Sequence, residues 1–212
     1  MKITFLHTSN SHINRFEKIV KEIDKNIETE HFVNEEILET ALKTGNIDVN
    51  GFRNEIARIK TGKYGRIICT CSTYGELCDN KDVFRIDKPI AENIVSKYSK
   101  IGIVFTVNST KEKSKSLLKK VAEKQGEQIK IIEINCEDCW QWFQEGDLKK
   151  YSIEIANRIK QKGNDFEVVF LAQASMERAK EYLVNENYKT VSSPKFGIEK
   201  YIELIKKEGS TQ

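Results

Sequence analysis

The chain has 212 residues, of which 39% are hydrophobic and 32% are charged, as in a globular protein with a sizeable core. Its formal net charge is only +3 and its lysines and glutamates are interspersed, so no basic face indicates a nucleic-acid partner. No apolar run approaches the roughly 18 residues of a membrane span, and no export signal is apparent. We therefore expect no membrane partner, a cytoplasmic location, and thiols rather than disulfides for the five cysteines.

Short runs rich in Ile, Val and Phe predict buried strands, because they do not alternate with polar residues. In chain order these strands cover residues 3–7, 66–70, 83–86, 101–107, 129–134 and 167–172, with a last strand ending at 191–194. Helical periodicity lies between them, at 16–23, 90–95, 117–121 and 153–159. Alternating strands and helices predict an α/β fold with parallel sheets.

A weak internal repeat predicts two pseudo-symmetric lobes, each a parallel sheet flanked by helices. A strand followed by a hydroxyl-rich loop near residue 5, and a strand ending near residue 71, each recur about 100 residues later. We place residues 1–99 and 195–212 in an N-terminal lobe and residues 100–194 in a C-terminal lobe. If the lobes face each other, the polar loops at their strand ends converge on one cleft.

The sharpest motif follows the strand near residue 70. Cys71 stands at the strand end, beside the hydroxyls of Ser72 and Thr73 and before an expected helix start. A helix N-terminus favours the thiolate and lowers a thiol pKa from its free value of about 8.5. Cys69 lies inside the apolar run and is interpreted as a small core residue. The alternative for Cys71 is an ordinary buried thiol.

The run Cys71-Ser72-Thr73 resembles the first catalytic loop of the aspartate/glutamate/hydantoin racemase superfamily. Residues 31–38, 84–91 and 101–110 are similar, in the same order, to segments of a subgroup of that superfamily. That subgroup has a Cys-Ser-Thr loop and a second loop Leu-Ala-Gln-Ala-Ser-Met, which matches residues 171–176. The resemblance implies two lobes with the active site between them. It also implies a cofactor-independent isomerase that acts at the carbon next to a carboxylate.

One residue departs from the family pattern. Racemases of this kind use two cysteines on opposite faces of the substrate carbon, and the second position falls on Gln173. Glutamine cannot carry a proton at neutral pH, although its amide can orient a carboxylate. Three mechanisms stay open: Cys71 as the single acid or base of a decarboxylase, Cys71 as the nucleophile of a cis/trans isomerase, or racemisation with another second base. His7 is the candidate for that base, and a satisfied strand-end histidine is the alternative.

We expect the remaining strand-end groups to bind a small carboxylate substrate, with no metal and no cofactor. A homodimer is the default expectation for the assembly. The rival interpretation, which Gln173 favours, is a non-catalytic carboxylate-binding protein with the racemase fold. The expected substrate-binding residues are Thr8, Ser9, Ser72, Thr73, Ser109, Thr110, Ala174 and Ser175, together with Gln173.

A second cysteine motif lies at Cys136 and Cys139, with the C-x-x-C spacing of a zinc half-site. No second pair completes such a site, and a redox role expects a helix start in a thioredoxin-like context, which we do not predict here. A structural pair is the preferred interpretation. Trp140, Trp142 and Phe143 follow directly and predict a hydrophobic anchor or a lid.

His31 with Glu35 and Glu36 has residue types that can bind a metal, but a solvated helix surface is the preferred interpretation. Neither a G-x-G-x-x-G run nor a P-loop occurs in the sequence, so nothing indicates dinucleotide or nucleotide phosphate binding.

Overall fold

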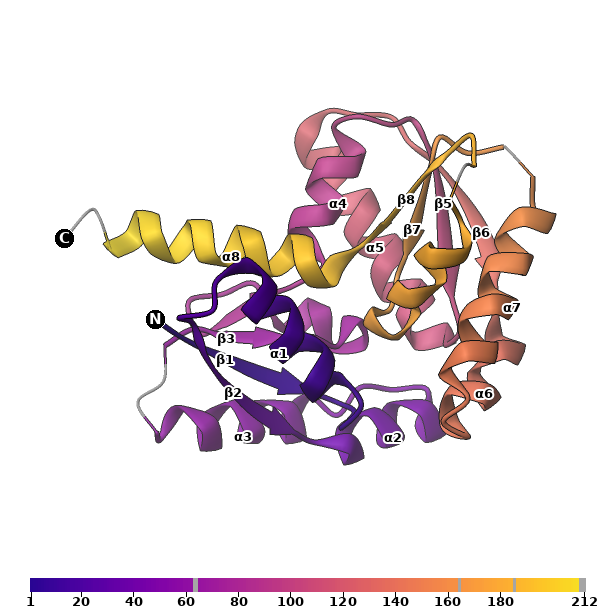
Figure 1. The fold of residues 1–212 in the computed structure, drawn as a ribbon. Coiled ribbons are helices and arrows are strands. Elements are labelled where there is room, and N and C mark those ends of the chain that lie inside the picture. The colour runs from indigo at the N-terminus through magenta and orange to yellow at the C-terminus, as the bar shows by residue number, and fades with distance from the viewer. Residues whose placement is uncertain (63–64, 164, 185, 210–212) are drawn as a thin grey trace. The chain divides into compact units, whose positions relative to one another are not determined.

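Figure 1 shows the fold in a computed structural model that describes residues 1–62, 65–163, 165–184 and 186–209. The chain divides into two compact units. Unit 1 comprises Met1–Pro89 and Pro194–Gln212, and unit 2 comprises Ile90–Ser193. Residues 90–99, which the sequence placed in the N-terminal lobe, lie in unit 2.

Unit 1 contains a parallel sheet in the order β2-β1-β3-β4. The strands are β1 (Lys2–His7), β2 (Glu28–Val33), β3 (Ile67–Cys69) and β4 (Val83–Arg85). The central strands β1 and β3 are buried on both faces, which explains their continuous apolar sequence. The sequence analysis missed β2, because this half-exposed edge strand mixes charged and apolar residues.

Helices cover both faces of this sheet. On one face, α2 (Glu35–Thr44) packs Ile37, and α3 (Val49–Lys60) packs Phe52, in the same apolar cluster as Leu6. On the other face, α1 (His12–Ile23) places Phe16 against Phe5, with ring centroids 5.5 Å apart. The C-terminal helix α8 (Ser193–Gly209) also belongs to this unit over nearly its whole length.

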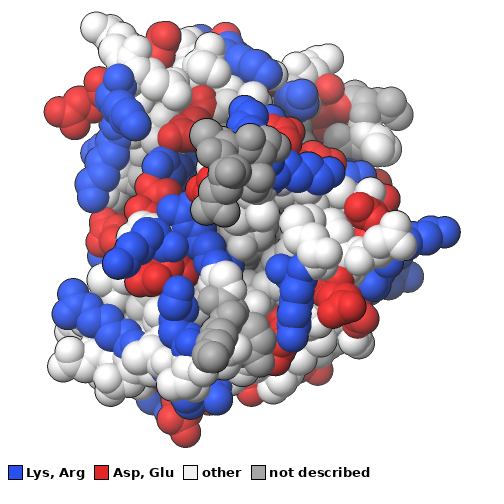
Figure 2. Space-filling view, turned by 90° about the vertical axis from the view of Figure 1, so that its left-hand side faces the viewer, with Lys and Arg blue, Asp and Glu red and all other residues white. Residues whose placement is uncertain are grey.

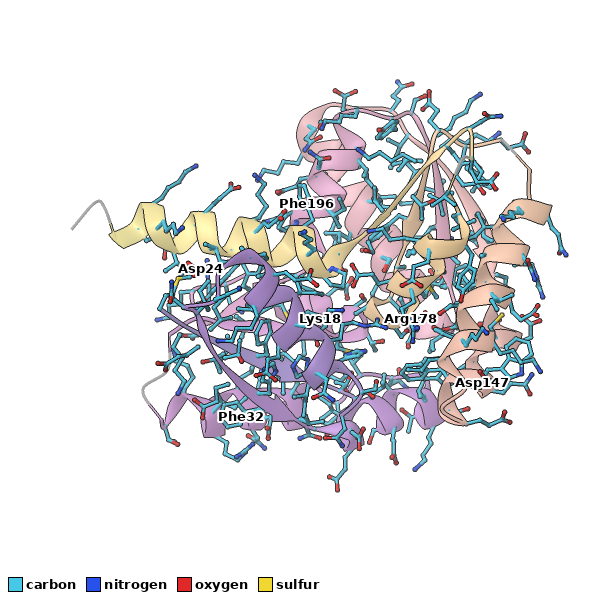
Figure 3. The ribbon with its side chains drawn as sticks, viewed as in Figure 1. Lys18, Asp24, Phe32, Asp147, Arg178 and Phe196 are labelled. Atoms are coloured by element: carbon cyan, nitrogen blue, oxygen red, sulfur yellow. The ribbon has the colours of Figure 1, made fainter. Side chains whose placement is uncertain are left out.

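Two contacts hold α8 on unit 1. The hydroxyl of Tyr201 donates a hydrogen bond to the Arg66 carbonyl at 2.6 Å, and its ring packs edge-on against Phe84. On the exposed side of the same helix, Lys200 Nζ lies 5.7 Å from the centroid of the Phe196 ring, which Figure 3 labels. The C-terminal helix is thus held on the unit whose sheet the chain start forms.

Unit 2 repeats this topology with a parallel sheet in the order β6-β5-β7-β8. The strands are β5 (Lys100–Phe105), β6 (Lys130–Asn135), β7 (Val168–Leu171) and β8 (Lys189–Ser192). The two strand orders correspond one to one. The predicted α/β class, with two pseudo-symmetric parallel sheets flanked by helices, is confirmed.

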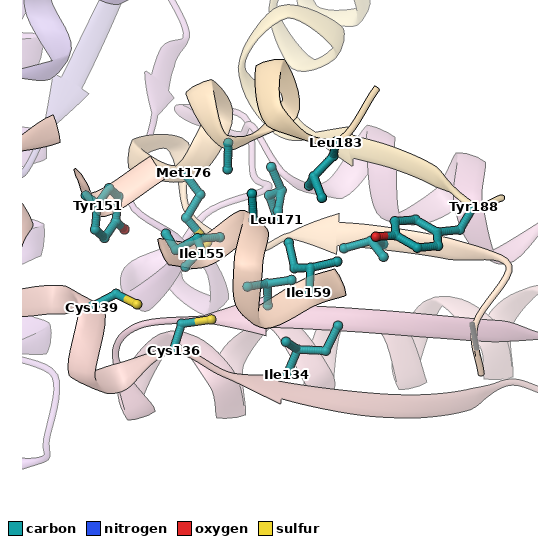
Figure 4. Close-up of a cluster of buried hydrophobic side chains, with 14 of the residues drawn as sticks. Ile134, Cys136, Cys139, Tyr151, Ile155, Ile159, Leu171, Met176, Leu183 and Tyr188 are labelled. Carbon is teal, nitrogen blue, oxygen red and sulfur yellow. The ribbon is translucent and has the colours of Figure 1, made fainter. Parts of the chain in front are cut away.

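The helices of unit 2 are α4 (Lys88–Val95), α5 (Asn108–Gln125), α6 (Trp140–Gln144) and α7 (Leu148–Gln161). Asp147, labelled in Figure 3, caps α7 by accepting a hydrogen bond from the Lys150 amide. Figure 4 shows how α7 packs Ile155 and Ile159 against Leu171 of the sheet. The side-chain amide of Gln125 donates to the Glu92 carbonyl and ties α5 to α4.

Short 3₁₀ turns follow three of the strands: η1 (Ser72–Leu77) after β3, η2 (Glu137–Cys139) after β6 and η3 (Ala174–Tyr182) after β7. Acidic and basic side chains lie intermingled over the face in Figure 2, as the small net charge predicts. Within the described residues, no helix combines the length and the apolar character that crossing a bilayer requires.

Candidate active site

The central strands of unit 1 form a topological switch point. From β1 the chain leads to β2 on one side of the sheet, and from β3 it leads to β4 on the other. In open α/β sheets, ligands bind outside the carboxyl ends of the strands at such a point. Thr8 directly follows β1, and Cys71 lies two residues beyond the end of β3. The fold therefore brings these two side chains to the place where a ligand is expected.

Cys71 is 9% exposed and is surrounded by hydrogen-bond donors. The Thr8 hydroxyl and the backbone N–H groups of Thr73 and Tyr74 all point to its sulfur. Burial raises the pKa of Cys71 to about 11, the neighbouring Cys69 adds to this rise, and the three donors lower it only in part. At neutral pH the residue is a thiol, with donors already in place for the thiolate.

The expected low pKa of Cys71 is therefore wrong for the ligand-free protein. The turn that follows Cys71 is a six-residue 3₁₀ segment rather than a full α-helix. Such a turn aligns few peptide dipoles, whereas removal from water acts on the whole charge of the thiolate. Burial is the larger effect, so the pKa rises.

The other predicted residues of unit 1 lie on the same loops. Ser72 and Thr73 are buried in η1. Ser9 lies in the loop after β1, where its hydroxyl is 2.9 Å from that of Ser11. Cys69 packs in the apolar cluster below the turn, as predicted, and its thiol donates a weak hydrogen bond to the Cys71 carbonyl.

Unit 2 has a switch point of the same kind between β5 and β7. Thr106 follows β5, and Gln173 lies two residues beyond the end of β7. The side-chain oxygen of Gln173 accepts hydrogen bonds from the Thr106 amide at 2.7 Å and from the Thr106 hydroxyl at 3.1 Å. No acceptor for the Gln173 side-chain nitrogen occurs among the described residues, so this N–H₂ group is available to a ligand.

Behind Gln173, a chain of hydroxyls leads into the core. The Thr106 hydroxyl is 3.3 Å from the Tyr151 hydroxyl, which is 2.9 Å from that of Ser175. Burial raises the pKa of Tyr151 to about 12, so this phenol stays protonated. Thr106 and Tyr151 were not singled out in the sequence. The strand-end rule could have found Thr106, but no local pattern marks Tyr151.

No protein-family model and no curated protein sequence matches the chain. Solved structures do match. Glutamate racemase isoform RacE1 from Bacillus anthracis superposes with a TM-score of 0.73 at 14% identity, over 97% of this chain and 82% of that one. Aspartate racemase from Picrophilus torridus gives 0.69 at 15% identity, over 91% and 89%. Allantoin racemase from Klebsiella pneumoniae gives 0.62 at 12% identity, over 97% and 87%.

The chain has the fold of the aspartate/glutamate/hydantoin racemases. The resemblance predicted from the sequence is thus confirmed at the level of the fold. Identities of 12% and 15% carry the fold alone, so the chemistry has to be argued from the residues of this chain.

Within this racemase fold, His7 lies on the other face of the unit 1 sheet from Thr8, because side chains alternate along β1. Its Nδ1 is 2.9 Å from the Thr70 hydroxyl and its Nε2 is 2.9 Å from His31 Nδ1. Burial, with a further effect of His12 and His31, lowers the pKa of His7 to about 2. These are the contacts of a structural histidine, and they lend no support to a role as the second base.

The predicted helix-surface position of His31 is wrong. His31 lies in strand β2, where it bonds to His7 and stacks on Phe5. The Glu35 carboxylate bonds elsewhere: it accepts hydrogen bonds from the backbone and side-chain nitrogens of Asn10. In the part of the chain that the structure describes, no three His, Cys, Asp or Glu side chains are placed to hold a metal ion.

The remaining candidates of unit 2 follow the ends of its strands in the chain. Ser109 and Thr110 are in the first turn of α5, and Ala174 is buried at the start of η3. Ser192, at the end of β8, accepts a hydrogen bond from Lys180 Nζ and donates one to the Glu177 carboxylate.

Cys136 and Cys139 are buried beside α7, as Figure 4 shows. The Cys136 thiol donates to the Cys139 sulfur, which raises the pKa of Cys136 and lowers that of Cys139. A 3₁₀ turn, η2, and the five-residue helix α6 follow Cys136 directly. In α6, Trp140 stacks on Phe143, which packs against Tyr151, so these aromatic residues anchor α6 on α7.

Proposed function

We propose that the chain is a cofactor-independent isomerase of the racemase type that acts on a small carboxylate. In this proposal, Cys71 transfers a proton at the carbon next to the carboxylate. The observation that carries it is a thiol at a strand-end switch point with three hydrogen-bond donors around its sulfur. The neighbours that share the fold are described as racemases of aspartate, glutamate and allantoin, which makes these compounds the first substrates to test.

The proton balance follows from the surroundings of Cys71. With a pKa of about 11 the free enzyme holds the proton on sulfur, so the thiol is a proton donor to a carbanion. When the proton leaves, Thr8 and the Thr73 and Tyr74 amides stabilise the thiolate. In the opposite direction the thiol first gives its proton to solvent. The thiolate then takes the proton from the substrate carbon, and the electron pair stays on carbon as an enolate.

Gln173 has a different part in the proposal. Its oxygen is held by Thr106, so its free N–H₂ group can donate to a carboxylate or an enolate oxygen. It neither takes nor gives a proton at neutral pH. We therefore assign proton transfer on one face of the carbon to the Cys71 thiol and substrate binding to the amide. Racemisation then takes its second proton from solvent water on the opposite face.

The same asymmetry favours a second candidate, a decarboxylase. There the substrate loses CO₂, the electron pair of the broken C–C bond stays on carbon, and Cys71 protonates that carbon from one side. A single proton donor is sufficient for this reaction, whereas racemisation also needs a proton to arrive on the opposite side.

The test uses the purified protein with each enantiomer of aspartate, glutamate and allantoin in D₂O. Proton NMR follows the loss of the α-hydrogen signal, circular dichroism follows racemisation, and released CO₂ reports decarboxylation. We expect exchange of the α-hydrogen in the wild type. In Cys71→Ser we expect a loss of about 100-fold or more, the size usual for a missing acid or base.

Cys78→Ala is the matched control. Cys78 is a buried thiol of the same unit, but its sulfur donates to the Tyr74 carbonyl instead of receiving donors. Its removal should leave exchange unchanged. Saturable binding of aspartate or glutamate without exchange or CO₂ release would show a binding protein instead of an enzyme.

A further inference from the structure

A buried ion pair lies at the carboxyl end of β4, behind the turn that carries Cys71. Arg85 is 6% exposed and Asp87 is 1% exposed. The guanidinium donates from Nε to Asp87 Oδ1 at 2.6 Å and from an Nη nitrogen to Oδ2 at 3.2 Å. Such pairs lose much of their attraction to desolvation and add little net stability. What the two parallel hydrogen bonds of such a pair do supply is a fixed orientation of the guanidinium relative to the carboxylate.

The group that this geometry fixes is Gly75, in the middle of η1. A Cβ built on Gly75 would lie 2.5 Å from the guanidinium carbon of Arg85 and 2.6 Å from its Nε. The guanidinium therefore lies directly against the backbone of the turn, at a distance that only glycine permits. The amides of Thr73 and Tyr74, which point to the Cys71 sulfur, immediately precede Gly75 in the same turn.

Among the described residues of unit 2, no arginine occupies the corresponding position. In the sheet of unit 1, Arg85 pairs with Cys69, two residues before the reactive thiol. In the sheet of unit 2, Ser192 pairs with Leu171, two residues before Gln173. A small serine thus occupies the position that corresponds to Arg85. The ion pair therefore lies behind η1, which follows Cys71, and not behind η3, which follows Gln173.

We propose that Arg85 and Asp87 are positioning residues that hold the turn at residues 72–77 so that its amides stay aimed at the Cys71 sulfur. A short 3₁₀ turn has poor hydrogen-bond geometry and needs such support. Asp87 fixes the plane of the guanidinium, and the guanidinium fixes the peptide of Gly75. The effect on catalysis rests on the proposed function, whereas the effect on the thiol does not.

The experiment measures the rate of Cys71 alkylation by iodoacetamide, from neutral pH to beyond the thiol pKa of about 11. Mass spectrometry of the peptides quantifies each cysteine, with Cys136 of unit 2 as the internal reference. Gly75→Ala adds a methyl group against the guanidinium without changing a charge. Arg85→Lys keeps the charge and loses the planar two-pronged contact.

Two control variants match these changes. Arg58→Lys alters another two-pronged pair of unit 1, that with Glu55, which lies on α3. Gly65→Ala adds a methyl group where no atom lies within 4 Å. Both should reproduce the wild-type alkylation profile.

We expect the high-pH alkylation rate of Cys71 to rise about tenfold in Gly75→Ala and Arg85→Lys, with kcat falling about 10-fold to 100-fold, as for a misplaced group. KM should change less than kcat. In an Arg85→Ala background, Gly75→Ala should have an effect at least about twofold smaller, because the two residues are in contact.

Wild-type alkylation profiles in both variants would overturn the proposal, whether or not the enzyme racemises anything. A rise of equal size at Cys136 would also overturn it, because it would report general opening of the protein. If the Cys71 profile moves while the wild type exchanges no α-hydrogen, the positioning role stands and the proposed function fails.

Discussion

The carboxyl ends of β3 and β7 are built alike but carry different chemistry. Each follows a central strand of a parallel sheet, each leads into a 3₁₀ turn, and each faces a threonine from the neighbouring strand end. At β3, Thr8 donates to a buried thiol. At β7, Thr106 donates to the oxygen of Gln173. One end directs three donors at a buried sulfur, and the other presents a neutral amide.

This difference shows that one fold can place chemically different side chains at corresponding strand ends. A symmetric pair of strand ends does not require a symmetric mechanism. The surroundings agree, because the thiol turn has a buried ion pair behind it and the amide turn has a chain of neutral hydroxyls.

The largest expected effect concerns the ion pair of unit 1. Asp87→Asn leaves the buried Arg85 charge without its partner, and we expect a loss of about 3–5 kcal/mol in the free energy of unfolding. The matched change in unit 2 is Asp138→Asn, whose partner Arg158 is 42% exposed and should cost only about 0–1 kcal/mol. Urea denaturation of both variants measures the difference. Equal losses would contradict the contrast between the two units.

The next prediction concerns pH. All three histidines of the chain lie in unit 1, and burial lowers the pKa of His12 from 6.5 to about 4. The unfolded chain binds a proton at this site below pH 6.5 while the folded one does not, so stability is full above pH 6.5. It is lost as the pH falls to about 4, by about 3 kcal/mol for this group. Hydrogen exchange should show unit 1 loosening in this range while unit 2 does not.

His12→Phe checks the cause of this acid sensitivity. Neither ring nitrogen of His12 has a hydrogen-bond partner among the described residues, so the substitution removes no bond that the structure shows. It should remove the His12 share of the acid sensitivity of unit 1, about 3 kcal/mol, while the share of His7 remains, and leave the stability at neutral pH equal or higher. If this variant loses as much stability at low pH as the wild type does, groups other than His12 cause the acid sensitivity.

A smaller effect is expected at Gln173 in unit 2. Gln173→Ala leaves the Thr106 amide and hydroxyl without their acceptor, which should cost about 1–3 kcal/mol of stability. If the side chain binds a carboxylate, KM should rise more than kcat falls. A fall in kcat alone, as large as that of Cys71→Ser, would give Gln173 a part in proton transfer and end the one-thiol assignment.

The smallest effect is expected at Tyr151. Tyr151→Phe removes the hydroxyl between Thr106 and Ser175, and about 1 kcal/mol should be lost. Because this hydroxyl reaches Gln173 only through Thr106, substrate binding should change by less than in Gln173→Ala. Thermal unfolding and KM measurements on Tyr151→Phe and Gln173→Ala show which variant loses more stability and more substrate binding.

The sequence predicted a large part of the fold and of the strand ends. Uninterrupted apolar runs are typical of central parallel strands, and the rule that ligands bind beyond their carboxyl ends led to Thr8, Cys71 and Gln173. The structure places all three at the switch points of their sheets. Only their positions follow from the fold. Their roles in a reaction stay proposals.

Other features were decided by tertiary structure alone. The pKa of Cys71 rises because atoms from distant parts of the chain exclude water from it. Arg85 touches Gly75 because β4 pairs with β3, and Tyr151 meets Thr106 because α7 packs on the second sheet. Local patterns report which residues form a strand or a helix. Burial and charge pairing depend on which elements become neighbours, and that is set only when the whole chain has folded.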